Sequence, residues 1–147
     1  MRKLSARLLL IGTMAGLVLA GCQSMAPENV QEKVVYHVND SDSATAALRN
    51  VGNHLDATEG KARIVVVTHA KGIDFLLDGA QDKNGNPYSI PVDKLKARGV
   101  DFRVCAITLK SRGIDPKTVI PEAQIVPSGV AEIGKLQARE GFVYLKP

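Results

Sequence analysis

From Lys33 onward, short apolar runs alternate with segments in which apolar residues recur every three or four positions. The runs indicate strands, and the periodic segments indicate helices with one buried face. The run at 63–68 is continuously apolar in its middle, which is typical of a strand covered on both sides. The strands are predicted at about 34–38, 63–68, 100–104, 124–126 and 142–145, and the helices at about 44–55, 91–98, 106–112 and 128–139.

Capping residues and periodicity define the helices more closely. Ser41 or Ser43 is expected to cap the first helix, and Ser128 to cap the last one. Periodicity divides the last helix into two faces, with Val130, Ile133 and Leu136 inward and Glu132, Lys135 and Arg139 outward. The segment 72–77 fits a short strand or a helical turn. The whole pattern predicts one α/β domain, with a five-stranded, mainly parallel sheet flanked by helices on both faces.

The beginning of the chain has the pattern of an export signal. Positive residues in the segment 1–7 precede an uncharged apolar run at 8–19, which is shorter than the roughly 20 residues of a membrane-spanning helix. The run ends in Leu19-Ala20-Gly21-Cys22, which is similar to a lipobox and predicts a lipid on Cys22. The alternative is a buried cysteine after an apolar helix.

These features predict a signal peptide at 1–21, a polar tether at 22–32 and a folded domain at 33–147. Two acyl chains on Cys22 would make membrane attachment stable. Because Gln23 rather than Asp follows that cysteine, analogy with known lipoproteins predicts the outer membrane as the location within the cell envelope. The protein is expected to be lipid-anchored at the outer membrane and to face the periplasm.

The charge of the chain gives no indication of a nucleic-acid partner. Removing the three basic residues of the signal from the total of 19 leaves 16 basic against 15 acidic residues. No cluster of Lys or Arg suggests a phosphate-binding surface, so nucleic acid is excluded as a partner. Aromatic residues are few, which disfavours a stacking platform for bases or sugars. The glycine-rich, nucleophile-elbow and zinc-protease motifs are absent from the sequence.

Three residues with reactive or coordinating side chains follow the first three predicted strands. His37 lies near the end of the first strand, His69 directly follows the second, and Cys105 follows the third. In parallel α/β sheets ligands bind beyond these strand ends. Cys105 also precedes the predicted helix 106–112, whose free N–H groups and positive dipole end stabilise a thiolate. Such a thiolate has a pKa below about 8.5, is nucleophilic and can carry a persulfide.

Each of these residues also has a purely structural interpretation. Cys105 fits a packing position at a strand end, and His37 and His69 fit hydrogen bonds to loop backbone. Together the three could bind zinc or copper, but no close ligand spacing supports a metal. We therefore expect no metal and no cofactor. His54 is expected to be solvated at the edge of the first helix.

The chain resembles the DsrE/DsrF-like family, which has the YchN-like fold, over about 33–147. The residues that carry the resemblance are Val34-Val-Tyr-His-Val38 with Ala47–Val51, Gly99–Leu109, and the ending Pro127–Val130 through Gly141–Pro147. The resemblance implies a five-stranded sheet between helices and assembly into trimers or hexamers. In the sulfur-relay members an active cysteine follows a strand and precedes a helix that ends in Arg-Gly.

Here that cysteine is Cys105, and Arg112-Gly113 closes the helix. The pocket candidates are His37, His69, Thr108 and Arg112. Arg112 and the nearby Lys110 either hold an anionic sulfur compound or form the solvated face of the helix. The chain departs from the relay members in one respect, because those are cytosolic and work in hetero-complexes.

Two functions are consistent with these residues. The first is a membrane-tethered sulfur carrier, in which Cys105 accepts sulfane sulfur and passes it to another thiol. Its partners would be a thiol protein or a small sulfur compound, and a carrier of this kind needs an accessible sulfur atom. The second is a non-enzymatic, oligomeric module that binds a small ligand or acts as a scaffold, in which Cys105 is incidental.

Overall fold

The computed structural model describes residues 30–147. The predicted signal peptide, the lipid attachment at Cys22 and most of the predicted tether lie outside the described residues. None of the helices within 30–147 is long and apolar enough to cross a bilayer. The described part is therefore the predicted folded domain and the last residues before it.

Five parallel strands form one sheet in the order β4-β3-β2-β1-β5. The strands are β1 (Lys33–Val38), β2 (Arg63–Thr68), β3 (Asp101–Cys105), β4 (Ala123–Val126) and β5 (Val143–Leu145). The α-helices are α1 (Ala44–Ala57), α2 (Ser89–Ala97), α3 (Ala106–Ser111) and α4 (Gly129–Glu140). Each strand agrees with its predicted range to within one residue at either end. The predicted α/β class and the parallel sheet are confirmed.

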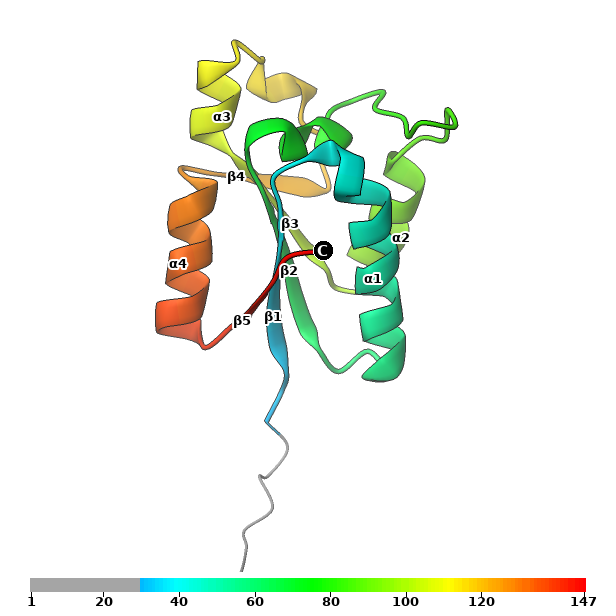
Figure 1. The fold of residues 1–147 in the computed structure, drawn as a ribbon, viewed down its shortest axis with the longest axis vertical. Coiled ribbons are helices and arrows are strands. Elements are labelled where there is room, and N and C mark those ends of the chain that lie inside the picture. The colour runs from blue at the N-terminus through cyan, green and yellow to red at the C-terminus, as the bar shows by residue number, and fades with distance from the viewer. Residues whose placement is uncertain (1–29) are drawn as a thin grey trace, which may run out of the picture.

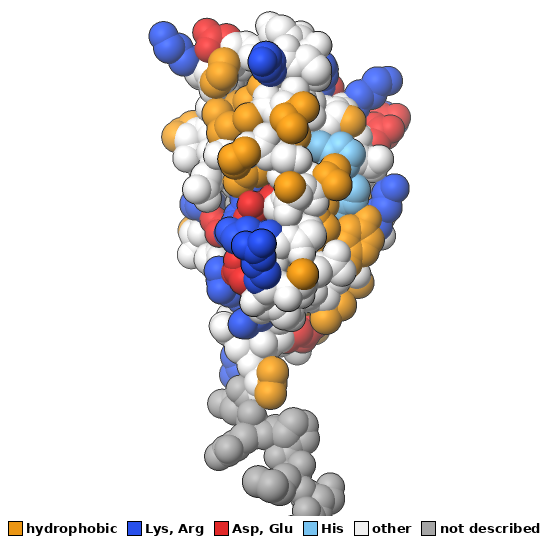
Figure 2. Space-filling model, turned by 90° about the vertical axis from the view of Figure 1, so that its left-hand side faces the viewer, with side chains coloured by type: hydrophobic (Ala, Val, Ile, Leu, Met, Phe, Trp, Pro, Cys, Tyr) orange, Lys and Arg blue, Asp and Glu red, His pale blue; other side chains and the backbone are white. Residues whose placement is uncertain are grey.

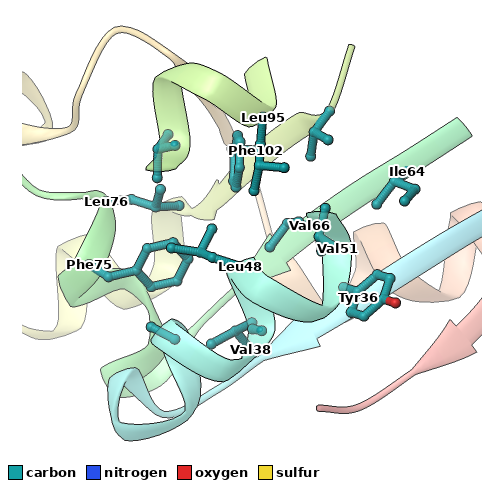
Figure 3. Packing of buried hydrophobic residues seen from close by; sticks show 14 of the residues in the cluster. Tyr36, Val38, Leu48, Val51, Ile64, Val66, Phe75, Leu76, Leu95 and Phe102 are labelled. Carbon is teal, nitrogen blue, oxygen red and sulfur yellow. The ribbon is translucent and has the colours of Figure 1, made fainter. Parts of the chain in front are cut away.

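Helices cover both faces of the sheet, as expected when the central strands are apolar on both sides. Figure 1 shows α1 and α2 on one face and α4 on the other. The larger core lies under α1 and α2, and Figure 3 shows Leu48 and Val51 of α1 and Leu95 of α2 packed over strand residues such as Val66 and Phe102. A smaller cluster under α4 contains Val35, Val65, Val67, Ile133, Leu136 and Phe142.

The segment between β2 and α2 is a 3-10 helix, η2 (Ala70–Leu76), so the helical alternative holds for 72–77. Gly72 explains part of this geometry, because a Cβ there would lie 2.1 Å from the carbonyl oxygen of Val38. Ser43 directly precedes α1 but makes no side-chain cap, and Asp40 caps the short 3-10 helix η1 (Ser41–Ser43) instead. Ser128 caps α4 as predicted, by accepting a hydrogen bond from Ala131 N.

The face assignment of α4 was wrong at two positions. Val130 is 65% exposed, although periodicity places it on the inner face. Glu132 is largely buried, with its side chain 12% exposed, because it pairs with the guanidinium of Arg103 on β3. Arg103 also pairs with Asp101, at 2.9 Å. A strand arginine turned toward α4 therefore draws one acidic residue of that helix inward, which helical periodicity alone does not reveal.

Candidate functional site

The order of the strands brings the three predicted residues to one edge of the sheet. Strands β3, β2 and β1 are neighbours, and Cys105, His69 and His37 lie at or just beyond their carboxyl ends. His37 is in register with Val67, and Val104 is in register with Thr68. The prediction that these side chains share one end of the sheet is therefore confirmed.

Cys105 is the last residue of β3, and donors surround its sulfur atom. Burial by itself raises the pKa of the thiol. The backbone N–H of Gly129, the hydroxyl of Thr108 and the N–H groups of Thr108 and Ile107 donate hydrogen bonds to the sulfur and outweigh that effect. The pKa of Cys105 is consequently lowered from its ordinary value. Hydrogen bonds to the charged form stabilise it, so the site favours a thiolate.

These donors come from the beginnings of two helices. Ile107 and Thr108 belong to the first turn of α3, which starts directly after Cys105, and Gly129 is the first residue of α4. The free N–H groups at a helix N-terminus carry a partial positive charge. The sulfur of Cys105 therefore receives donors from two separate chain segments, only one of which is adjacent to it in sequence.

Gly129 allows the second segment to come this close. A Cβ at position 129 would lie 3.2 Å from the Cβ of Cys105, 3.3 Å from the Cβ of His69 and 3.0 Å from the carbonyl oxygen of Thr68. Contacts this short require the neighbours to shift. The same distances show that His69 and Cys105 both lie against the start of α4, so the two side chains belong to one cluster.

Thr108 links the cysteine to the loop that carries His69. Its Oγ1 accepts a hydrogen bond from Ala70 N at 3.0 Å, while its hydroxyl donates to the sulfur of Cys105. Ala70 has a φ of 52°, an uncommon value for a residue other than glycine. Thr108 is buried, and its hydrogen bond with the exposed Ala70 is part-buried.

Arg112 holds the same loop from the end of α3. Its Nη1 donates to the carbonyl oxygen of Ala70 at 3.1 Å and to Asp74 Oδ1 at 2.5 Å. Arg112 is exposed, as predicted for the solvated face of the helix, and these contacts also pair its charge within the protein. Lys110 is exposed too, but it forms no ion pair within residues 30–147.

His37 and His69 form a directly bonded pair. Their Nε2 atoms are 2.6 Å apart, and the rings stack with centroids 4.7 Å apart. His37 Nδ1 lies 2.7 Å from the hydroxyl of Tyr144 on β5. One Nε2 must donate and the other accept, so the pair is compatible with neutral rings.

Neighbouring charge and burial both disfavour protonation of either ring to the charged imidazolium. Burial, the neighbouring His69 and Lys146 lower the pKa of His37 to about 4. Burial and the charge of Lys146 also lower the pKa of His69. The two rings are therefore neutral at physiological pH, and hydrogen bonds rather than a charged imidazolium stabilise the Cys105 thiolate.

His54 lies outside this site, and its predicted solvation was wrong. Its Nδ1 is 3.0 Å from the hydroxyl of Tyr36, and its Nε2 is 2.9 Å from Glu32 Oε1. The ring ties α1 to β1 and to the residue before that strand. Within residues 30–147, no group of three or more His, Cys, Asp or Glu side chains is arranged to hold a metal ion.

The sulfur of Cys105 lies beneath the surface, with the residue 4% exposed. This differs from the accessible sulfur that a carrier was expected to need. The nearby surface is apolar, because Ile107 on α3 and Val130 on α4 are 61% and 65% exposed. Figure 2 shows histidine side chains in pale blue beside hydrophobic side chains in orange on this side of the molecule. Approach to Cys105 therefore crosses an apolar rim.

Sequence reasoning missed Tyr144 and Gly129. Tyr144 reaches His37 because β5 pairs with β1, with Val35 in register with Tyr144. The available signal was weak, consisting of one polar aromatic residue in the last apolar run and one glycine directly after the capping Ser128.

Comparisons with known proteins agree with this fold. The model of the DsrE/DsrF-like family matches residues 32–147. The solved structure of MTH1491 from Methanobacterium thermoautotrophicum, a protein of unknown function, is similar at 31% identity and a TM-score of 0.69, covering 79% of this chain and 99% of that one. The ychN protein from E. coli is similar in fold at 18% identity and a TM-score of 0.64, with the same shares covered. No functionally curated protein matches the chain.

Proposed function

Because this chain belongs to the DsrE/DsrF-like family, which includes sulfur-relay proteins, we propose that it is a sulfur carrier that works through the Cys105 thiolate. Family membership indicates a sulfur-relay-related function in general terms. The observation that carries the specific proposal is the set of donors from Ile107, Thr108 and Gly129 around one sulfur atom. A packing cysteine has no need of such donors, whereas a nucleophilic thiolate does.

The proposed reaction has two steps. The Cys105 thiolate attacks the sulfane sulfur of a persulfide or polysulfide donor and forms a new S–S bond, while the donor's S–S bond breaks. The electron pair of the broken bond leaves with the donor's remaining sulfur as a thiolate. An acceptor thiolate then attacks the outer sulfur of the Cys105 persulfide, and Cys105 departs as a thiolate. Sulfur moves as a neutral atom, so neither an oxidant nor a reductant is required.

The neutral histidine pair shapes the side of this site next to β1. His69 is held beside Cys105 by the hydrogen bond from Ala70 N to Thr108, and His37 is held by Tyr144. The apolar rim at Ile107 and Val130 and the burial of Cys105 favour small donors such as short polysulfides over bulky ones.

Intact-mass measurement after incubation with polysulfide tests this function. A Cys22→Ser background makes Cys105 the sole cysteine of the chain. The proposal expects mass increases in steps of one sulfur atom, removed by a thiol reductant and absent in Cys105→Ser. Thiosulfate serves as a second donor. An unmodified protein, or equal modification of Cys105→Ser, contradicts the proposal.

The burial of Cys105 specifically favours a second candidate, a non-enzymatic oligomeric module in which this cysteine is incidental. The same measurement separates the two. If Cys105 reacts with polysulfide only after the protein is denatured, the module replaces the carrier.

We also propose that the protein is anchored in the cell envelope by lipid on Cys22 and forms a homo-oligomer, with a trimer favoured. The apolar sequence that ends at Cys22 supports the anchor. A subunit contact is supported by apolar side chains that remain uncovered in one subunit. These are Ile107 on α3, Ile125 on β4 and Val130 on α4.

A further inference from the structure

A groove separate from the cysteine site lies between α1 and α2. These helices cover the sheet face opposite α4 (Figure 1), and none of the residues around Cys105 lines the groove. Its volume is about 560 Å³. Small-molecule sites usually have roughly 300–1,000 Å³. The groove is therefore large enough for a small organic ligand.

The floor and one wall of this groove are apolar. Leu48 from α1 and Leu95 from α2 form the floor with the ring of Tyr88, and all three belong to the main core. Ile90 and Pro91, in the first turn of α2, form the wall, and Ile90 is 53% exposed. One exposed isoleucine is ordinary on a protein surface. Here it extends a concave apolar surface that begins in the core.

The rim of the groove is positively charged. Arg49, Lys94 and Arg98 line it, with Asp82 as the single acidic residue. Arg98 is paired with Asp56 at 2.6 Å. The Asp82 carboxylate accepts hydrogen bonds from two backbone N–H groups and one side-chain amide of its own turn. Among residues 30–147 neither Arg49 nor Lys94 has an ion-pair partner, so two cations stand beside the apolar floor.

We propose that this groove binds a single-chain carboxylic acid of the fatty-acid class. The acyl chain lies on Leu48, Leu95 and Ile90, and the carboxylate lies between Arg49 and Lys94. A neutral apolar ligand would leave both cations unused. A partner protein would need about 800 Å² on each side of a standard interface, an extent that suits a broad surface better than a groove of this volume. This site is independent of sulfur transfer at Cys105.

Calorimetric titration of the full chain with dodecanoate tests the proposal. The chain carries Cys22→Ser, so that no acyl group at that position competes with the probe. Saturable binding of dodecanoate at one site per chain is expected, with weaker binding of dodecanol and weaker still of dodecyltrimethylammonium. Absence of saturable binding below the micellar concentration overturns the proposal, and so does equal binding of the three probes.

Charge reversal and an apolar substitution locate the site. The double variant Arg49→Glu with Lys94→Glu should bind dodecanoate about tenfold more weakly, because two charges that attract the carboxylate become repulsive. Its binding of dodecanol should be unchanged. Lys110→Glu on α3 is the matched control and should bind like the parent. Ile90→Gln should weaken dodecanoate and dodecanol alike. Unchanged dodecanoate binding in both groove variants would contradict binding in this groove. A second contradicting outcome is that an acidic helical peptide displaces dodecanoate whereas a second fatty acid does not.

Discussion

Replacing Thr108 by valine tests the physical basis of the cysteine site most directly. Valine has nearly the shape of threonine but lacks the hydroxyl. The change removes a donor to the Cys105 sulfur and the acceptor of Ala70 N. Because Thr108 is buried, water does not readily take the place of its hydroxyl beside the sulfur. Thr108→Val should therefore raise the pKa of the Cys105 thiol and weaken the loop that carries His69.

The expected size follows from ordinary hydrogen-bond energies. A hydrogen bond to a charged group contributes about 1.5–3 kcal/mol, and about 1.36 kcal/mol corresponds to a tenfold change in the ionisation equilibrium. The thiolate population below the pKa should therefore fall by about tenfold or more. Losing the part-buried hydrogen bond from Ala70 N should lower the free energy of unfolding by about 0.5–1.5 kcal/mol.

Alkylation of Cys105 by iodoacetamide, followed across pH in the Cys22→Ser background, measures the thiolate population. Urea unfolding measures stability. Thr108→Ser should retain most of the parent reactivity, because it keeps the hydroxyl. Ser111→Ala is the matched control, since Ser111 donates to the carbonyl oxygen of Thr108 and is not a donor to the sulfur. If the pH profile of Thr108→Val matches that of the parent, the donors do not set the ionisation of Cys105 and the reasoning is refuted.

Four further outcomes are expected. Gly129→Ala should cost about 1–3 kcal/mol of unfolding free energy and slow alkylation of Cys105, because its Cβ would crowd Cys105 and His69; an unchanged urea midpoint contradicts this. Since the folded pKa of His37 is about 4, against about 6.5 unfolded, the unfolded chain binds more protons between these values. The contribution of His37 to the stability of the fold is thus complete above about pH 6.5 and is lost as the pH falls toward 4. The urea midpoint should therefore depend less on pH in His37→Gln than in the parent. Light scattering should show an oligomer that Val130→Asp weakens, whereas a monomeric parent at micromolar concentration counts against the subunit contact. The protein should partition into detergent and Cys22→Ala should not; parent protein that remains in the aqueous phase counts against the anchor.

The sequence predicted what depends on short segments and on general rules of parallel sheets. Each of His37, His69 and Cys105 follows a recognisable apolar run, and the carboxyl ends of parallel strands meet at one edge. Those two facts are enough to bring the three residues together. The α/β class and the positions of the strands follow from the same periodicity.

The remaining features depend on which elements become neighbours, and the hydrophobic pattern does not contain that information. Tyr144 reaches His37 only because β5 lies beside β1. Gly129 reaches Cys105 only because α4 begins next to the end of β3. Glu132 turns inward because Arg103 on β3 needs a partner beneath α4. The burial of Cys105 results from the same approach of α4, so it too could not be inferred from its place after a strand.

The pairing of β1 with β5 has a consequence for the order of assembly. These two strands are more than a hundred positions apart, since His37 and Tyr144 are separated by 107 positions, yet they are adjacent in the sheet. Contacts between such distant segments form late, because the chain between them must first be closed into a loop. A growing chain that has not yet reached Tyr144 leaves one edge of β1 unpaired, and an open strand edge invites pairing with other chains. The domain therefore completes its sheet, and the support of His37, only when the last strand has arrived.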